Sequence, residues 1–186
     1  VAQLCEALGH AHENGVWHRD IKPSNVIMTK AGRVKIADFG IARTDNTGLT
    51  MANSVLGTPM YMAPEQFMGR AIDHRVDLYG AGVVLYQLVA GRPPFVGTPE
   101  SLMYRVVNDM PLPPSAAEGA MHGDRFDRAV ATALAKDPSE RYASAAAFRN
   151  AVSAALGQPV PPAVSQEAVH ALPMPTEYAP TERITP

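Results

Sequence analysis

Cysteine is nearly absent from the 186 residues, and the single Cys5 excludes an internal disulfide bond. This usage fits a reducing compartment, and Cys5 lies on an apolar helical stripe where a small buried side chain is expected. No signal peptide is visible, and no apolar run is long enough to cross a bilayer. The formal charge of -2 favours neither a nucleic acid nor an anionic membrane as a partner. These features predict a soluble cytoplasmic protein.

Length and composition predict one globular domain. Hydrophobic residues make up 46% and charged residues 18% of the chain, which allows a true core in a soluble fold. The composition changes after Gly157, where prolines recur and apolar residues stand singly. We therefore expect a domain over residues 1–156 and a Pro-rich disordered linker or tail over 157–186. The chain starts at Val1 in the middle of a helical pattern, which is typical of a fragment.

Hydrophobic periodicity predicts a mainly α-helical domain with one short β-hairpin. The hairpin pairs strands 26–28 and 34–36 through a turn at Gly32, and 41–62 reads as a polar loop. The helix over 77–90 is apolar nearly all round, so we expect it to be buried on every side. The other predicted helices run from Val1 to the stop at Gly15, over 99–108, over 124–136, and from a Ser144 cap to about residue 156.

The octapeptide HRDIKPSN, residues 18–25, has the residue types of a phosphoryl-transfer loop. The carboxylate of Asp20 can accept or orient a hydroxyl proton, and the side-chain carbonyl of Asn25 can bind Mg²⁺. Lys22 adds a positive charge where phosphate charge develops. The predicted hairpin would hold this loop beside Asp38.

Two further motifs follow in order, Asp38-Phe39-Gly40 and Ala63-Pro64-Glu65. Together with HRDIKPSN they resemble the catalytic loop, metal-binding loop and activation-segment end of a protein kinase. The resemblance covers residues 1–156 and is to the large, mostly helical C-terminal lobe of an α+β kinase. Lys22 and the strings GTPMYMAPEQ and GRPPF look most like bacterial relatives of the eukaryotic Ser/Thr kinases.

This resemblance implies transfer of the ATP γ-phosphate to Ser or Thr hydroxyls of proteins. Asp20 would be the base and Lys22 would contact the phosphate, while Asn25 and Asp38 would hold Mg²⁺ or Mn²⁺. Thr58 resembles the Thr that bonds Asp20 and Lys22 and shapes the substrate pocket. Ile27 resembles the apolar residue under the adenine ring, although a plain core Ile is an equally fair interpretation.

The same resemblance assigns structural roles. His18 and Phe39 would pack on each other and on the buried helix, and Asp77 would accept hydrogen bonds from the backbone of the HRD motif. Glu65 and Arg141 match an ion pair that ties the activation segment to the helical base.

Arg19 precedes Asp20, and the resemblance implies that its guanidinium pairs with a phosphate on the activation loop. Thr50 is the first candidate acceptor, followed by Thr47, Ser54 and Thr44. Each of these is equally well interpreted as a solvated loop hydroxyl. A second Thr that bacterial relatives often carry nearby is replaced here by Ala52, which weakens the assignment.

The sequence contains no Gly-rich loop, no strand Lys paired to a helix Glu and no adenine hinge. We therefore predict that this chain alone binds ATP weakly and transfers phosphate negligibly. Its expected partners are the N-lobe of the same polypeptide, protein substrates and a second copy for trans-autophosphorylation, without nucleic acid. A segment after residue 186 would anchor the full-length protein if it is a membrane kinase.

Two other functions compete with an active protein kinase. One is an inactive or pseudokinase-like lobe that serves as a binding or regulatory module. The inactive lobe is the less favoured of the two, because all four expected catalytic residues are intact: Asp20, Lys22, Asn25 and Asp38. The other is a small-molecule kinase of the aminoglycoside phosphotransferase type, which shares the H-x-D-x-x-x-x-N loop but lacks the segment from DFG to APE.

Overall fold

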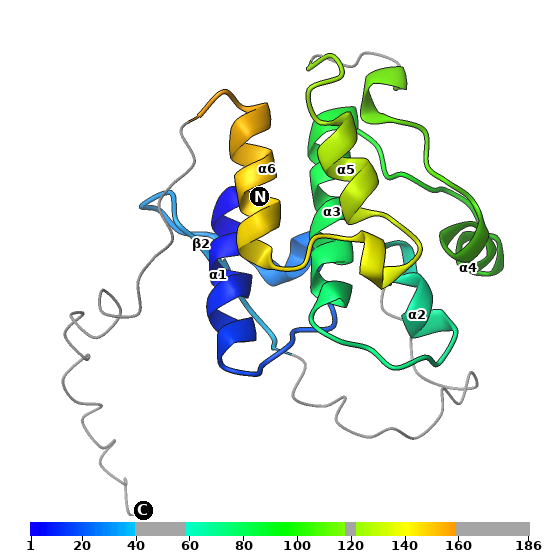
Figure 1. The fold of residues 1–186 in the computed structure, drawn as a ribbon, viewed down its shortest axis with the longest axis horizontal. Coiled ribbons are helices and arrows are strands. Elements are labelled where there is room, and N and C mark those ends of the chain that lie inside the picture. The colour runs from blue at the N-terminus through cyan, green and yellow to red at the C-terminus, as the bar shows by residue number, and fades with distance from the viewer. Residues whose placement is uncertain (40–58, 118–121, 159–186) are drawn as a thin grey trace, which may run out of the picture.

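The computed structural model, which describes residues 1–39, 59–117 and 122–158, is mainly helical (Figure 1). This confirms the predicted mainly α content with one short antiparallel sheet. None of the helices in these ranges combines the length and hydropathy that a membrane span needs. The helices are α1 (Ala2–Glu13), α2 (Pro64–Phe67), α3 (Arg75–Ala90), α4 (Pro99–Asn108), α5 (Asp127–Ala133) and α6 (Ala145–Ala155). The strands are β1 (Val26–Met28) and β2 (Val34–Ile36), and the 3₁₀ turns are η1 (Pro23–Asn25), η3 (Pro59–Tyr61), η4 (Pro114–Ala116) and η5 (Pro138–Glu140).

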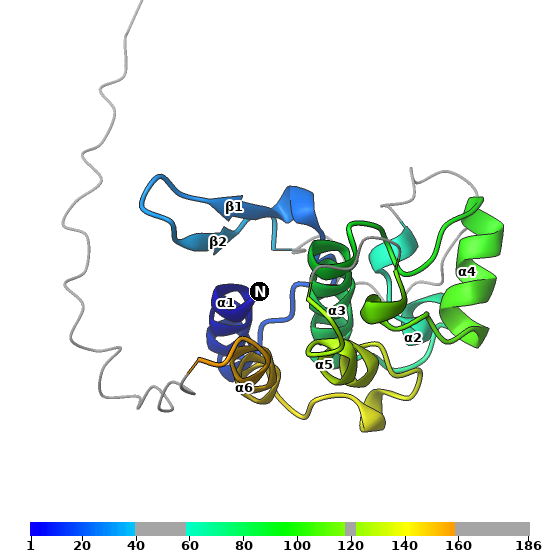
Figure 2. The same cartoon turned by 90° about the horizontal axis from the view of Figure 1, so that it is seen from above.

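Helix α3 is the central element, with α1 and α6 on one side of it and α2 and α4 on the other (Figures 1 and 2). Its residues from Val76 to Tyr86 are all buried. Two glycines permit this enclosure. A Cβ on Gly80 would lie 2.9 Å from the carbonyl oxygen of Ile21, and one on Gly82 would lie 2.7 Å from Cβ of Ala133. The loop after His18 and the end of α5 therefore approach α3 more closely than any side chain there would allow.

The expectation that α3 is buried on every side is wrong for its last turn. Leu88 is 66% exposed, and Gln87 and Val89 are partly exposed. The first turns are enclosed by neighbouring helices, whereas the last turn borders an open pocket that Gln87 and Pro93 help to line. The helix ends at Gly91, whose left-handed conformation (φ 69°) closes it.

Helices α1 and α6 pack side by side (Figure 2). The buried stripe on α1 consists of Leu4, Cys5, Leu8 and Ala11, as its helical spacing predicts. On α6, the Ser144 hydroxyl accepts a hydrogen bond from the amide of Ala147 at 3.1 Å, so the predicted N-cap is present. The tail predicted for 157–186 lies almost entirely outside the described residues and stays a prediction.

Helix α5 is shorter than the predicted 124–136. It begins at Asp127 after a turn at Gly123 and ends at Ala133. Beyond its end, the carbonyl groups of residues 135 and 136 accept hydrogen bonds from the Arg141 side chain, at 2.8 and 3.2 Å. Residues 134–136 therefore lie outside the helix, although the helical pattern of the sequence continues through them.

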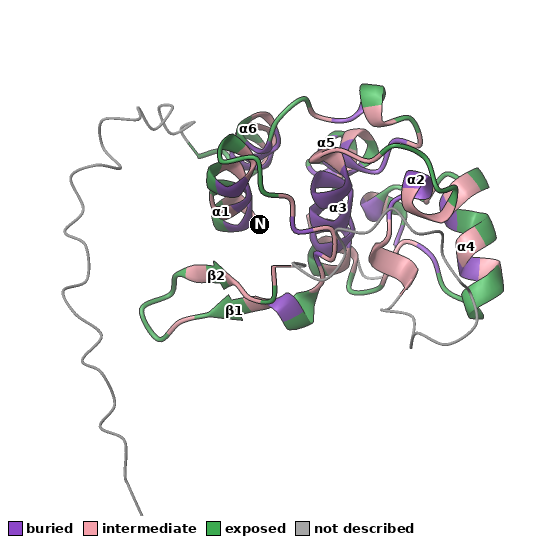
Figure 3. Ribbon diagram, turned by 90° about the horizontal axis from the view of Figure 1, so that it is seen from below, coloured by how far each residue is buried: buried purple, intermediate pink, exposed green. Residues whose placement is uncertain are grey.

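The hairpin lies over α1 and is anchored to it by one side chain (Figure 2). Val26 pairs with Ile36 and Met28 with Val34. Gln3 of α1 accepts a hydrogen bond from the amide of Val34 at 2.8 Å and donates one to the carbonyl of Gly32 at 3.3 Å. The outer side of the hairpin is largely exposed, in contrast to the buried α3 (Figure 3).

Candidate active site

A buried carboxylate of α3 holds the backbone of the HRD motif. Asp77 is fully buried, and its two carboxylate oxygens accept hydrogen bonds from the amides of His18 at 2.9 Å and Arg19 at 2.6 Å. Nε2 of His12 is a third partner at 2.9 Å. Arg19 has φ 65°, a conformation that costs a non-glycine residue about 1–3 kcal/mol. The Asp77 bonds are each worth about 1.5–3 kcal/mol, which is enough to hold this strained backbone.

Asp20, Lys22 and Asn25 converge on one centre. Nζ of Lys22 lies 2.8 Å from Oδ2 of Asp20. Nδ2 of Asn25 donates to the backbone carbonyl of Asp20 at 2.8 Å and lies 3.4 Å from its Oδ2. The 3₁₀ turn η1, closed by the bond from the Asn25 amide to the Lys22 carbonyl at 3.0 Å, produces this convergence. The Asp20 side chain is 29% exposed, so its carboxylate is accessible from solvent.

Ala37, which precedes Asp38, makes two hydrogen bonds that hold this part of the chain. Its amide donates to the carbonyl of Asn25 at 2.9 Å, and its carbonyl lies 2.8 Å from Nε2 of His18. Nδ1 of His18 accepts from the Asp20 amide at 3.2 Å, so Nε2 is the nitrogen that carries the proton and donates to Ala37. The rings of His18 and Phe39 meet edge to face with centroids 5.0 Å apart.

Asp38 is therefore held between two anchored neighbours. It has φ 55° and an exposed side chain, and the preceding residue is bonded to Asn25. A backbone strained in this way persists where neighbouring contacts hold it, as those of Ala37 and Phe39 do here.

The chemistry of these donors fits a magnesium ion. The amide nitrogen of Asn25 is bonded to Asp20, which makes its carbonyl oxygen the atom that can bind a metal, and Asp38 supplies a carboxylate. Mg²⁺ keeps several waters and uses one or two protein oxygens together with substrate phosphates. The described ranges contain no group of three or more His, Cys, Asp or Glu residues placed to hold a metal.

Glu65 and Arg141 form a buried bidentate ion pair at the base of the molecule. The guanidinium nitrogens lie 2.6 and 2.7 Å from the two carboxylate oxygens, and the residues are only 3% and 4% exposed. Arg141 also lies over the ring of Tyr79, 5.0 Å from its centroid. The pair joins residues that are 76 positions apart in the chain.

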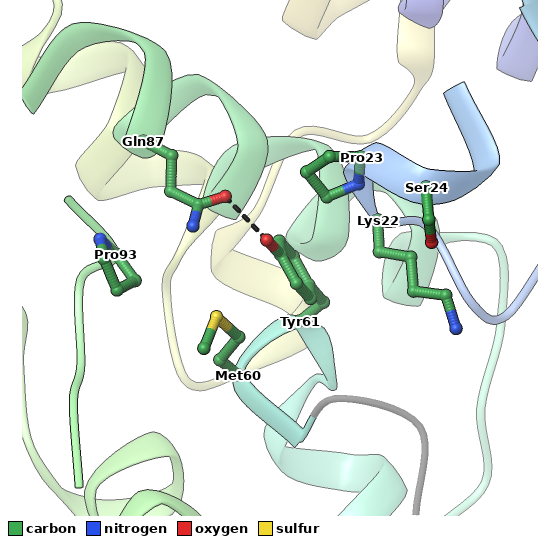
Figure 4. Close-up of a pocket in the computed structure, with 7 residues that line it drawn as sticks. All are labelled: Lys22, Pro23, Ser24, Met60, Tyr61, Gln87 and Pro93. Carbon is green, nitrogen blue, oxygen red and sulfur yellow. Dashed lines mark hydrogen bonds between the residues drawn. The ribbon is translucent and has the colours of Figure 1, made fainter. Parts of the chain in front are cut away.

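Sequence reasoning missed the polar contacts of Gln66 and Tyr61, and that of His12 with Asp77. The Gln66 side chain accepts from the Ala63 amide at 2.8 Å and donates to the Arg19 carbonyl at 3.1 Å. The Tyr61 hydroxyl donates to Oε1 of Gln87 at 2.8 Å, as Figure 4 shows. Tyr61 and Gln66 both belong to the string GTPMYMAPEQ. That string indicates the family, but its spacing does not show which partners these two side chains bind.

Several predicted site residues are not brought to the centre by the described structure. Ile27 is 50% exposed on β1. The Arg19 guanidinium lies 5.5 Å from the centroid of the Trp17 ring. The remaining candidates, Thr44, Thr47, Thr50, Ser54 and Thr58, lie outside the described residues.

Comparison with known proteins places the chain in a family. A protein kinase domain model matches residues 1–153. The serine/threonine-protein kinase PknB of Mycobacterium leprae is 44% identical over 152 residues, 80% of this chain and 24% of the relative. PknB of Mycobacterium tuberculosis is 42% identical over 153 residues, with the same coverage, and Pkn1 of Myxococcus xanthus is 44% identical over 169 residues, 86% of this chain and 24% of the relative. The chain thus spans about a quarter of the length of these relatives, and it belongs to the protein kinase family.

Proposed function

We propose that this chain is the helical C-terminal lobe of a protein Ser/Thr kinase, which transfers the γ-phosphate of ATP to Ser or Thr hydroxyls of proteins. The convergence of Asp20, Lys22 and Asn25 carries the proposal, because it joins a reachable carboxylate, a cation and a carbonyl ligand in one loop. The relatives named as serine/threonine-protein kinases support the choice of acceptor.

Asp20 orients the acceptor hydroxyl and takes its proton. The hydroxyl oxygen forms the new bond to the γ-phosphorus, the bond from that phosphorus to the bridging oxygen breaks, and ADP leaves. Lys22 holds Oδ2 of Asp20 and places its charge beside the transferred group. Nothing covalent is required of the protein, so the rate depends on how well this loop is positioned.

Asn25 and Asp38 are the residues that would hold the magnesium ion. When bound, the ion neutralises charge on the nucleotide phosphates. The bond from Ala37 to Asn25 keeps the two ligands next to each other before nucleotide arrives. Ile27, exposed on β1, is the proposed adenine contact.

Two proposals concern parts outside this centre. The 186 residues contain no Gly-rich loop, strand Lys or hinge, so we expect them to bind MgATP weakly without an N-lobe. Arg19 next to Asp20 is the proposed receptor for an activation-loop phosphate, with Thr50 as the first candidate acceptor.

The test uses the protein expressed from its complete coding sequence, with γ-labelled ATP, Mg²⁺ and a Ser/Thr peptide library. Replacing Asp20 by Asn should lower kcat by about 100-fold or more, because the carboxylate that accepts the proton is lost. Asp124→Asn, at an exposed position, is the matched control and should retain full activity. Activity in the Asp20 variant within about threefold of the wild type would refute the proposal. Absence of any transfer by the wild type would favour the non-catalytic module.

A further inference from the structure

The peptide bond between Arg19 and Asp20 is held from both sides. Its carbonyl oxygen, which belongs to Arg19, accepts a hydrogen bond from Nε2 of Gln66 at 3.1 Å. Its amide, which belongs to Asp20, donates to Nδ1 of His18 at 3.2 Å. The amide before it, that of Arg19, donates to Asp77 at 2.6 Å. Side chains from separate segments of the chain therefore restrain the backbone that leads into the candidate base.

This backbone needs outside support because Arg19 lies in the left-handed region. Its φ is 65°, a conformation that a non-glycine residue keeps only where the surrounding contacts enforce it. The Cα atom of Asp20 belongs to the same planar peptide unit as the Arg19 carbonyl. A rotation of that unit that relieved the strain would therefore also displace the Asp20 carboxylate. The hydrogen bond from Gln66 to the carbonyl oxygen opposes this rotation.

The two ends of the Gln66 side-chain amide have different tasks, and its partners settle its orientation. Oε1 accepts a hydrogen bond from the amide of Ala63 at 2.8 Å, and a backbone N–H can only donate. Nε2 therefore faces the carbonyl oxygen of Arg19, which can only accept. The Oε1 bond closes the first turn of α2 and is local, whereas the Nε2 bond reaches 47 residues back to the HRD motif.

The backbone that carries Gln66 is itself firmly anchored. The preceding residue, Glu65, is 3% exposed and makes both hydrogen bonds of the ion pair with Arg141. Two consecutive side chains of α2 thus join it to two different parts of the molecule, the helical base and the HRD motif. A hydrogen bond from a residue on so fixed a segment can restrain its partner, because the donor cannot easily follow a movement of the acceptor.

Resting on the proposed function, we infer that Gln66 is a positioning residue for Asp20. Its Nε2 holds the Arg19 carbonyl, and this keeps the carboxylate that takes the hydroxyl proton in line with the acceptor. Gln66 acts through the backbone and not on the reacting atoms. A misplacement of about 1 Å can cost on the order of 100-fold in rate. Loss of this one restraint, with those of His18 and Asp77 intact, should therefore lower kcat about tenfold.

Two variants of Gln66 separate positioning from local folding. Gln66→Glu keeps an oxygen for the Ala63 amide and loses the donor to Arg19. Gln66→Met has a similar length, carries no charge and loses both bonds. In the protein from its complete coding sequence, we expect both variants to lower kcat for peptide phosphorylation about tenfold. The KM values for MgATP and peptide should stay within about twofold of the wild type. A residue that only closed the turn of α2 would lose activity in Gln66→Met and keep it in Gln66→Glu.

Gln3 offers a matched control, because its side chain makes the same two kinds of hydrogen bond. Its Oε1 accepts from the amide of Val34 at 2.8 Å, and its Nε2 donates to the carbonyl of Gly32 at 3.3 Å. Gln3→Glu deletes the same kind of donor and adds the same charge, but at the hairpin turn. It should leave kcat within about twofold of the wild type.

The outcomes separate this inference from the kinase proposal. A kcat within about twofold of the wild type in either Gln66 variant overturns the inference and leaves the kinase proposal standing. Loss in Gln66→Met alone would assign Gln66 to the turn of α2, and loss in Gln66→Glu alone would be an effect of the added charge. A tenfold loss in Gln3→Glu, or a tenfold rise in either KM, also overturns it. Failure of the wild type to phosphorylate any peptide refutes the proposed function and this inference with it.

Discussion

Replacing Glu65 by Ala removes one half of the buried ion pair and leaves the guanidinium of Arg141 without its carboxylate. Two charged hydrogen bonds of 2.6 and 2.7 Å are lost. Each is worth about 1.5–3 kcal/mol, which sums to about 3–6 kcal/mol. Arg141 keeps its bonds to the carbonyls of Ala135 and Lys136, so the cost should lie near the lower end, about 3 kcal/mol.

The free energy of unfolding would be measured on the 186-residue chain by urea titration followed by far-UV circular dichroism. A loss of about 3 kcal/mol corresponds to a fall in Tm of about 6–12 °C for a domain of this size. Glu65→Gln keeps one acceptor and should cost less than Glu65→Ala. In a double-mutant cycle with Arg141→Met, the double variant should be more stable than the sum of the single losses predicts.

The control is a second Glu–Arg pair of the same chain, Glu6 with Arg149. Its atoms lie 3.8 Å apart and the Glu6 side chain is 49% exposed, so Glu6→Ala should cost less than about 1 kcal/mol. A loss below about 1 kcal/mol in Glu65→Ala, or full additivity in the cycle with Arg141, would refute the view that this pair holds the activation-segment end to the helical base.

Three further predictions follow from two buried groups, Asp77 and Cys5, and from the half-buried Lys136. Asp77→Asn turns one oxygen that accepts a backbone amide into a donor. The variant should therefore lose about 1–3 kcal/mol in the free energy of unfolding, measured by urea titration, and have a lower kcat. An unchanged free energy and an unchanged kcat would contradict the role of Asp77. Burial raises the pKa of the Cys5 thiol to about 12. Cys5 of the native protein should therefore react with a thiol reagent at least about 100-fold more slowly than Cys5 of the protein unfolded in urea. Equal rates in the two states would show that the α1–α6 contact opens freely. Burial lowers the pKa of Lys136 to about 8 from 10.5, so the unfolded chain binds more protons above pH 8 and the lysine's contribution to stability rises with pH. Urea titrations between pH 8 and about 9.5, below the range of ordinary tyrosine titration, should show this rise in the wild type relative to Lys136→Met, and parallel profiles would contradict it.

Much of the helical framework is predictable from local pattern. The apolar stripe of α1, the Ser144 cap of α6 and the glycine after α3 are local signals, and each appears where the periodicity places it. The length of α5 is not predictable in this way, because the helical pattern of the sequence continues past Ala133, where the helix ends. Exposure of Leu88 is equally a tertiary outcome, since nothing in the helical pattern marks which turn borders the pocket.

The candidate site also contains residues that the sequence predicts and contacts that it does not predict. The residues of HRDIKPSN and DFG can be recognised as motifs in the sequence, because phosphoryl transfer restricts their residue types and spacing. The supporting contacts of His12 and Gln66 are not, because a histidine on a helix or a glutamine after a turn has no spacing rule that predicts its partner. Asp77 and Ala37 show why the motif works: a buried carboxylate and a single backbone pairing bring separate loops to one centre.

The central claim is that Asp20, Asn25 and Asp38 form one phosphoryl-transfer centre in which the metal and proton functions are separate. Mn²⁺ binding in the presence of ATP, followed by electron paramagnetic resonance on the protein from its complete coding sequence, tests it directly. We expect Asp38→Asn to weaken Mn²⁺ binding at least about tenfold and Asp20→Asn to leave it within about threefold of the wild type. Tight Mn²⁺ binding by Asp38→Asn, or its loss in Asp20→Asn alone, would contradict the account.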